Sequence, residues 1–455
     1  MKKMNVVIVE THDSGRYISP YGYKLPTPRL ELFARESTLF RQCFSAAPTC
    51  SPSRAGLLTG YTPHENGMQG LASRGWRLRD YNKHIARYLS SCGYHSVLCG
   101  IQHVAPDYRM IGYDEVIGSQ EFSMDKTEKS MEEWDYANTQ TVVRFLKGYS
   151  GEKPFFLNFG LFNTHREYPT ANGKEDSKYI RAPEVLYDCP ENRYDMADYC
   201  ASVHVVDTCF GQVVDALKAT GLIDNTLLIF TTDHGVAFPK MKCTLYDSGI
   251  GVALMVAFPG NPSCGEVLDC LVCHYDLFPT ICDFVQVPKP SWLEGVSLLP
   301  LLQKKIDKVR DEIFGEVTYH AAYEPKRCIR TERYKLIRNY DYHLAVVPAN
   351  IDEAKSKDFL FRHGYPHRSK EREYLFDLYL DPQERENLIG DKAYEDVYNN
   401  LSTRLYEWMK KTDDPLLTYT HRVPKPQGAR INKLTCMNPR SLDFEPAEAT
   451  DYSWD

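Results

Sequence analysis

The chain has 455 residues, of which 43% are hydrophobic and 25% charged, with a net charge of -7 and a pI near 6.1. The acidic balance argues against a nucleic-acid-binding protein, which would carry a basic face. No apolar run approaches the roughly 18 residues that a membrane helix needs, so no membrane association is expected. The fourteen cysteines form no compact framework. The N-terminal segment Met1–Val9 has only a short apolar core followed by a polar motif, which favours a first strand over an export signal. These features predict reduced thiols and a cytoplasmic location, with a periplasmic or secreted location as the alternative if a signal peptide was removed.

Short apolar runs alternate with helical patterns through most of the chain. The patterns predict strands and helices in turn, with strands at Val6–Val9, Ser96–Leu98, Phe155–Phe159 and Leu227–Thr231, and helices at Lys83–Ser91, Asn138–Lys147 and Tyr199–Ala219. This alternation predicts an α/β fold with a large, mostly parallel sheet flanked by helices. In such sheets ligands collect beyond the carboxyl ends of the strands, where most of the polar motifs lie.

The pattern changes after about residue 320. Cys328–Arg338 and Tyr374–Tyr379 are typical of strands with one exposed face, and Tyr394–Lys411 is typical of an amphipathic helix. We therefore expect a larger domain over residues 1–320 that carries the chemistry. A smaller C-terminal subdomain over 321–455, an antiparallel sheet plus a helix, would complete the substrate pocket.

The segment Cys50-Ser51-Pro52-Ser53-Arg54 places a cysteine four residues before an arginine at a predicted helix start. Pro52 suits the first turn of this helix, and Gly60 suits its end. Cys50 would then lie beside the positive end of the helix, with Arg54 directed toward the same point. The alternative is a buried structural cysteine that precedes an ordinary helix.

This segment, continued by Leu57-Leu58-Thr59-Gly60, resembles the signature C-x-P-S-R and L-x-x-G of the sulfatase family. His64–Leu71 looks like the sulfamidase branch, the heparan N-sulfatases, and the similarity continues to Leu375–Leu388. The resemblance implies an alkaline-phosphatase-like fold and the hydrolysis of an O-sulfate ester or N-sulfate of a sulfated saccharide, as in glycosaminoglycan degradation. It also implies that a formylglycine-generating or radical maturation enzyme oxidises Cys50 to formylglycine, whose hydrate is the nucleophile. An oligomer is possible.

Two polar pairs at strand ends are similar to the metal ligands of that family. His12-Asp13 follows the first strand, where the family has two aspartates, and Asp233-His234 follows a later strand. Together with Cys50, these residues imply a bound divalent cation. Carboxylate ligands suit Ca²⁺, the expected ion, or Mg²⁺, whereas imidazole shifts the preference toward a transition metal.

Three further positions match catalytic positions of the family. The resemblance implies that His103 holds the nucleophile and that Lys242 binds the sulfate, and it makes His165 the candidate general acid. Ile101 stands where the family usually has a second sulfate-binding lysine. We expect Arg16 or Gln102 to supply the missing donor.

The segment Thr318–Arg327 is similar to a sulfamidase segment that precedes the C-terminal subdomain. His320 and Arg327 in this segment are candidate sugar contacts, or else structural residues at the junction of the two domains. Two other functions stay open at this point. One is a phosphonate monoester or phosphodiester hydrolase with the same fold and nucleophile, and the other is a non-catalytic relative that binds sulfated glycans.

Overall fold

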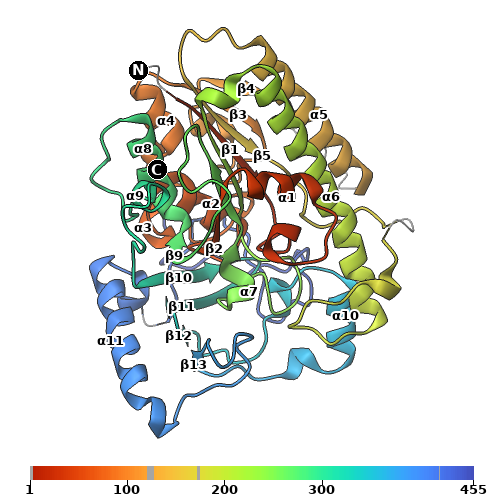
Figure 1. Cartoon of the computed structure of the whole chain (residues 1–455). Coiled ribbons are helices and arrows are strands. Elements are labelled where there is room, and N and C mark those ends of the chain that lie inside the picture. Colours follow the sequence, from red (N-terminus) through yellow and green to blue (C-terminus); the bar gives the residue numbers. More distant parts are fainter. Residues whose placement is uncertain (1–3, 120–127, 172–174, 420, 455) are drawn as a thin grey trace.

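The computed structural model describes residues 4–119, 128–171, 175–419 and 421–454 (Figure 1). Met1–Lys3, at the start of the segment that we compared with an export signal, lie outside the described residues. The larger of two sheets runs β4-β3-β5-β1-β6-β8-β2-β7, and β9 pairs with β2. Its strands are β1 (Asn5–Thr11), β2 (Thr38–Phe44), β3 (His95–Gly100), β4 (Glu115–Ile117), β5 (Phe155–Gly160), β6 (Thr226–Thr232), β7 (Gly251–Val252), β8 (Leu254–Ala257) and β9 (Val267–Cys273).

The helices of this larger unit cover both faces of its sheet, as Figure 1 shows. They are α1 (Pro28–Arg35), α2 (Cys50–Thr59), α3 (Pro63–Asn66), α4 (Ile85–Ser91), α5 (Glu128–Gly148), α6 (Pro190–Ala219), α7 (Asp247–Ile250), α8 (Leu277–Val285) and α9 (Leu299–Leu302). The pairings of β1 with β5 and β6, and of β3 with β4 and β5, are parallel. The predicted α/β class and its mostly parallel sheet are therefore confirmed.

A separate antiparallel sheet forms the C-terminal part of the chain. It contains β10 (Glu312–Tyr319), β11 (Tyr323–Thr331), β12 (Tyr334–Asn339) and β13 (Glu373–Asp377) in sequence order. Helix α11 (Glu395–Lys411) packs against β11 and β12, and α10 (Lys355–Arg362) packs against α6 (Figure 1).

The prediction of one strand over Cys328–Arg338 was wrong. The Thr331 hydroxyl bonds the backbone of Tyr334 and closes a turn between two strands.

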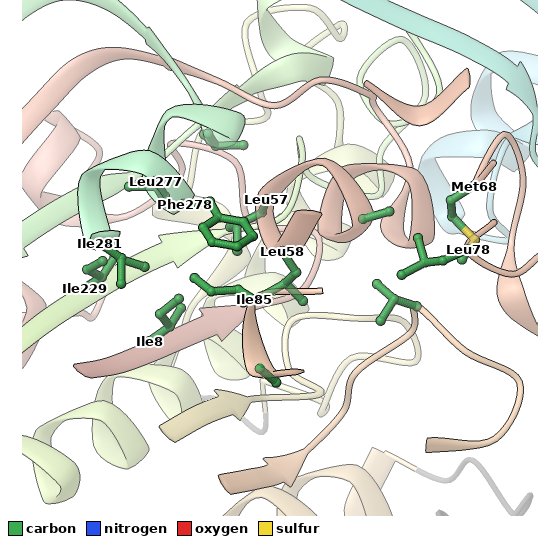
Figure 2. Packing of buried hydrophobic residues seen from close by; sticks show 14 of the residues in the cluster. Ile8, Leu57, Leu58, Met68, Leu78, Ile85, Ile229, Leu277, Phe278 and Ile281 are labelled. Carbon is green, nitrogen blue, oxygen red and sulfur yellow. The ribbon is translucent and has the colours of Figure 1, made fainter. Parts of the chain in front are cut away.

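Two hydrophobic cores lie on opposite faces of the larger sheet. One joins α2, α4, α8 and α9 to the sheet, and the other joins α1, α5 and α6 to it. Figure 2 shows Leu57 and Leu58 of α2 among Phe278 and Ile281 of α8 and Ile8 of β1. Because α2 is buried over its whole length, the position of its first residue is fixed by the core.

Within the described residues, no helix combines the length and the apolar character needed to span a lipid bilayer.

Candidate active site

Four neighbouring parallel strands place the predicted polar residues at one edge of the larger sheet. The adjacent order β3-β5-β1-β6 brings the segments that follow these strands side by side. They carry, in that order, His103, His165, the His12-Asp13 pair and the Asp233-His234 pair. Residues Glu10 and Thr11 align with Thr231 and Thr232, so β1 and β6 end at the same level. The Asp13 amide then donates to Asp233 Oδ1 at 2.8 Å.

Cys50 is the first residue of α2 and is 3% exposed. The helix thus begins two residues before Pro52, where we expected its start. The expected end at Gly60 is confirmed, because Gly60 has a left-handed φ of 77°. Cys50 Sγ lies 3.3 Å from His234 Nε2 and 3.8 Å from Asp13 Oδ1. The helix start therefore directs its side chain toward the two strand-end pairs.

The residues around Cys50 fit a divalent cation. Donor atoms of His12, Asp13, Cys50 and Asp233 all lie within 4.8 Å of one another, and all four side chains are buried. Both ring nitrogens of His12 lack a hydrogen-bond partner among the described residues, although Nδ1 is 3.1 Å from Asp233 Oδ2. Two buried carboxylates and an unbonded imidazole form a donor set for a metal ion. His234 lies beside this set, with Nε2 3.0 Å from Asp13 Oδ1.

Arg54 pairs with two carboxylates of this site, Asp233 and Glu10. Its guanidinium is fully buried and donates to Asp233 Oδ2 at 3.2 Å and to Glu10 Oε2 at 3.0 Å. Burial raises the pKa of Glu10 to about 7, although Arg54 opposes that rise. Removal of one partner from such a buried pair leaves an uncompensated charge. Arg54 therefore orients Asp233 and holds α2 against β1.

Lys242 approaches the site from the other side. Its Nζ is 2.8 Å from Asp13 Oδ2 and 3.0 Å from Asp352 Oδ2. Burial raises the pKa of the Cys50 thiol, but Lys242, His234 and His12 together outweigh burial, and the net value falls to about 7. Burial also raises the pKa of Asp233, but His234, His12 and Arg54 bring it well below its usual range. The cations around Cys50 thus favour the anionic form of its side chain.

His103 and His165 form the partly exposed mouth of the site. Their rings lie 4.7 Å and 5.3 Å from the ring of His12, centroid to centroid. His165 Nδ1 is hydrogen-bonded to the carbonyl oxygen of Arg166. A carbonyl can only accept, so Nδ1 carries the proton, and Nε2 is the unprotonated nitrogen of the neutral ring. Burial lowers the pKa of His165 to about 4, so the ring is neutral at neutral pH in the chain without substrate.

Two candidate donors for the missing lysine lie outside this site. The Arg16 guanidinium donates to the Cys43 carbonyl at 2.9 Å and lies over the Phe44 ring, on β2. The Gln102 side chain accepts from the amides of Val104 and Ala105 within its own loop. Both side chains make these structural contacts, and their role as sulfate donors stays a prediction.

The two predicted sugar contacts, Arg327 and His320, differ in their exposure and in their hydrogen-bond partners. Arg327 is fully buried and pairs with Asp414 at 2.5 Å and Glu316 at 3.3 Å, so it joins parts of the chain and cannot reach a sugar. His320 is 5% exposed, and its Nδ1 has no partner among the described residues. Burial lowers the pKa of His320 to about 3, and Lys242 contributes to that shift, so His320 lies near the site.

Sequence reasoning assigned no role to Glu10 and did not identify Asp352. Glu10 carries a usable signal, because a carboxylate near the end of a buried apolar strand needs a buried cation as partner. Asp352 carries no such signal. It lies in an irregular segment between β12 and α10, far from Lys242 in the sequence.

Comparisons with known proteins agree over nearly the whole chain. A family model described as sulfatase matches residues 4–287, and one described as N-sulphoglucosamine sulphohydrolase, C-terminal, matches residues 235–347. Human N-sulphoglucosamine sulphohydrolase is 28% identical over 95% of this chain and 93% of its own length. An ulvan-active sulfatase of Formosa agariphila is 29% identical over 96% of this chain and 87% of its own.

Solved structures share the fold at lower identity. A putative sulfatase from Bacteroides thetaiotaomicron has a TM-score of 0.72 at 21% identity, over 92% of this chain and 94% of that one. A phosphonate monoester hydrolase from Silicibacter pomeroyi has a TM-score of 0.69 at 19% identity, over 91% and 97%. A third protein, solved with its substrate D-glucosamine-2-N,6-O-disulfate, has a TM-score of 0.68 at 20% identity, over 92% and 100%.

Proposed function

The chain belongs to the sulfatase family, and from this premise we propose that it removes sulfate from a sulfated saccharide through a nucleophile made from Cys50. One observation carries the proposal. Cys50 lies at the start of a buried helix, within 3.8 Å of the carboxylate of Asp13 and close to the cation of Lys242. A cation, a carboxylate pair and a candidate nucleophile thus converge on a space where an anionic group can bind.

The group made from Cys50 would be formylglycine, whose hydrate supplies one hydroxyl to attack sulfur and a second hydroxyl through which sulfate can leave. A dedicated maturation enzyme would have to oxidise the thiol. His12, Asp13 and Asp233 would hold a divalent cation beside it, with His234 adjacent, and such an ion lowers the pKa of a hydroxyl and neutralises sulfate charge. The carboxylates favour Ca²⁺, while His12 also admits a transition metal.

The chain's own side chains would do the remaining work. The Lys242 ammonium, held between Asp13 and Asp352, would bind a sulfate oxygen and strengthen this contact as charge develops there. His165 Nε2 points away from the Arg166 carbonyl and would deliver a proton to the bridging oxygen or nitrogen once the ring gains its second proton. His103, whose ring contacts that of His12, would orient the nucleophile.

The substrate that we propose to test first is an N-sulfated glucosamine. The human relative is named for that activity, and the C-terminal family model with the same name matches residues 235–347. The protein should be coexpressed with a maturation enzyme. Sulfate release would be measured on N-sulfoglucosamine and an aryl sulfate, and release of the phenol on an aryl phosphonate monoester. We expect N-sulfoglucosamine to be cleaved with the highest kcat/KM.

The control for this assay is Cys50→Ala, which should release neither sulfate from the sulfated substrates nor phenol from the aryl phosphonate. Preferential cleavage of the aryl phosphonate would contradict the proposed reaction. Preferential cleavage of the aryl sulfate would retain the sulfatase chemistry and reject only the N-sulfate.

A further inference from the structure

A cavity of about 570 Å³ lies between the larger unit and the four-stranded sheet, beside Lys242. Its walls come from the loop that holds Lys242, from β11 and β12, and from the segments around Tyr365 and Gln383. The volume falls within the range of small-molecule binding sites. Two of its lining side chains, Lys242 and Lys326, are less than 9% exposed, whereas Arg368 is exposed. The cavity therefore reaches from solvent to the catalytic lysine.

The lining of this cavity is strongly cationic. Two carboxylates, Glu324 and Glu384, face six cationic side chains, which are Lys240, Lys242, Lys326, Arg368, Lys370 and Arg385. Both carboxylates are already paired. Glu324 lies 2.8 Å from Lys326 and 2.7 Å from Lys370, and Glu384 lies 2.7 Å from Lys335, outside the lining. The excess positive charge is therefore available to a ligand.

Three of these cations lack an acidic partner. Among the described residues, Lys240, Arg368 and Arg385 make no ion pair, and the Arg385 guanidinium donates to the Glu184 carbonyl oxygen at 2.8 Å. Burial lowers the pKa of Lys240, and the two arginines lower it further, because like charges crowd one another there. Lys240 is partly buried and the two arginines are exposed, and a bound anion would relieve the repulsion among these three cations.

The loop that links the cavity to the reacting site has an unusual backbone. Lys240 and Cys243, on either side of Lys242, adopt left-handed φ values of 65° and 64° although neither is a glycine. Such conformations cost free energy and cluster where a loop must hold a ligand-binding side chain in place. An aromatic wall is also present. Tyr246, Tyr365 and Tyr374 line the cavity, and Lys240 Nζ lies over the Tyr365 ring, 5.6 Å from its centroid.

We propose that this cavity binds a second anionic group of the saccharide, a carboxylate or a sulfate, while the reacting sulfate lies at Cys50. The inference rests on the proposed function and deepens it, since it makes the substrate a saccharide with at least two anionic groups. Lys242 connects the two places, because its Nζ lies 2.8 Å from Asp13 and its side chain also lines the cavity.

The test uses the full chain with Cys50→Ala, so that saccharides bind without reacting. Titration calorimetry would measure Kd for N-sulfoglucosamine, for its 6-O-sulfated form, and for a disaccharide in which N-sulfoglucosamine is linked to glucuronic acid. The variants are Lys240→Gln and Arg368→Gln. The matched control is Lys392→Gln, which removes an exposed lysine from the C-terminal part of the chain.

We expect each cavity variant to weaken at least one doubly anionic probe about tenfold, while N-sulfoglucosamine stays within about twofold of the parent. The control should bind all three like the parent. Loss confined to the disaccharide identifies a carboxylate as the second group, and loss confined to the disulfate identifies a sulfate. Equal loss for all three probes, no loss for any, no binding of either doubly anionic probe, or competition by inorganic sulfate as strong as by the disaccharide would overturn the inference.

A separate turnover assay distinguishes this inference from the proposed function. If the matured chain with Cys50 releases no sulfate but the binding differences persist, the proposed reaction fails and the anion-binding cavity stands. If it releases sulfate but the cavity variants bind like the parent, only the cavity inference fails.

Discussion

The ammonium of Lys242 is buried between two carboxylates from distant parts of the chain. Asp13 lies at the end of β1, and Asp352 precedes α10. A lysine held from both sides has little freedom to leave the site, so a sulfate oxygen would meet a preorganised donor. This arrangement gives Asp352 a positioning role.

Lys242→Ala should therefore lower kcat/KM by about a hundredfold to a thousandfold, the usual cost of removing one preorganised donor. Asp352→Asn keeps an oxygen acceptor beside the ammonium and should lose less, mainly in kcat. The measurement is sulfate release under matched maturation, with Lys392→Ala as the control. An unchanged kcat/KM in Lys242→Ala would contradict the role of this lysine.

His12 distinguishes this carboxylate site from one built of oxygen donors alone. Both of its ring nitrogens lack a hydrogen bond among the described residues. A ring nitrogen of His12 also lies within 4.8 Å of carboxylate oxygens of Asp13 and Asp233. An imidazole ligand raises the affinity for transition metals relative to Ca²⁺. The residue at position 12 should thus tune which cation binds.

We expect His12→Asp to bind Ca²⁺ more tightly and Zn²⁺ more weakly than the parent, both in the Cys50→Ala background. Equilibrium dialysis with each metal alone gives the two dissociation constants without any need for activity. His12→Asn separates the added charge from the change of donor atom. The same ratio of Zn²⁺ to Ca²⁺ affinity in parent and His12→Asp would show that His12 is not a ligand.

Helix α4 begins at a buried histidine that the chemistry does not use. His84 Nδ1 accepts the Ala86 amide at 3.1 Å as the N-cap, and burial lowers the pKa of His84 to about 3. In the unfolded chain this histidine has an ordinary pKa near 6.5. The unfolded state therefore binds the proton first, and the stability that neutral His84 contributes is lost as the pH falls below about 6.5.

His84→Asn keeps a cap acceptor and removes the titrating group. Between pH 7.5 and 5.5 the parent should lose about 1 kcal/mol more unfolding free energy than His84→Asn, by linkage through this single group. Urea unfolding at the two pH values measures the difference. An equal loss in both proteins would contradict the shifted pKa.

The elements that form the larger sheet could be predicted from the sequence, because their signals are local. Buried parallel strands such as β1 and β6 read as short apolar runs, and their polar ends were identified with them. The identity of the chemistry came from the resemblance carried by Cys50 and Arg54, and membership of the sulfatase family is confirmed.

What could not be predicted depends on tertiary contacts. The turn that divides β11 from β12 rests on a hydroxyl of Thr331, and the pattern of alternating residues continues through it. Arg16 follows the first strand as Asp13 does, yet its side chain turns toward β2. The Lys242–Asp352 pair joins residues that no sequence spacing relates.

The C-terminal part of the chain is joined to the larger unit through a buried ionic network. Arg327 of β11 pairs with Asp414 after α11 and with Glu316 of β10, and Glu316 in turn bonds His64 of α3 at 2.9 Å. The network crosses from the four-stranded sheet to α3, which packs against the helix that begins at Cys50, so it fixes the two parts relative to each other.

Arg327→Met should lower the free energy of unfolding by about 3–5 kcal/mol, because it leaves buried carboxylates without their cation. Denaturant unfolding measures that loss. For the fraction that stays folded, KM for N-sulfoglucosamine should be unchanged, since Arg327 has no exposed surface. A raised KM with unchanged stability would instead support a sugar contact.

The whole account depends on the chemical state of Cys50. Mass spectrometry of the tryptic peptide that spans residues 42–54, taken from preparations made with different amounts of maturation enzyme, gives the fraction that carries an aldehyde in place of the thiol. We predict that the rate of sulfate release rises in proportion to this fraction and vanishes where the peptide carries only the thiol. Full activity in protein whose Cys50 is entirely unmodified would contradict the account.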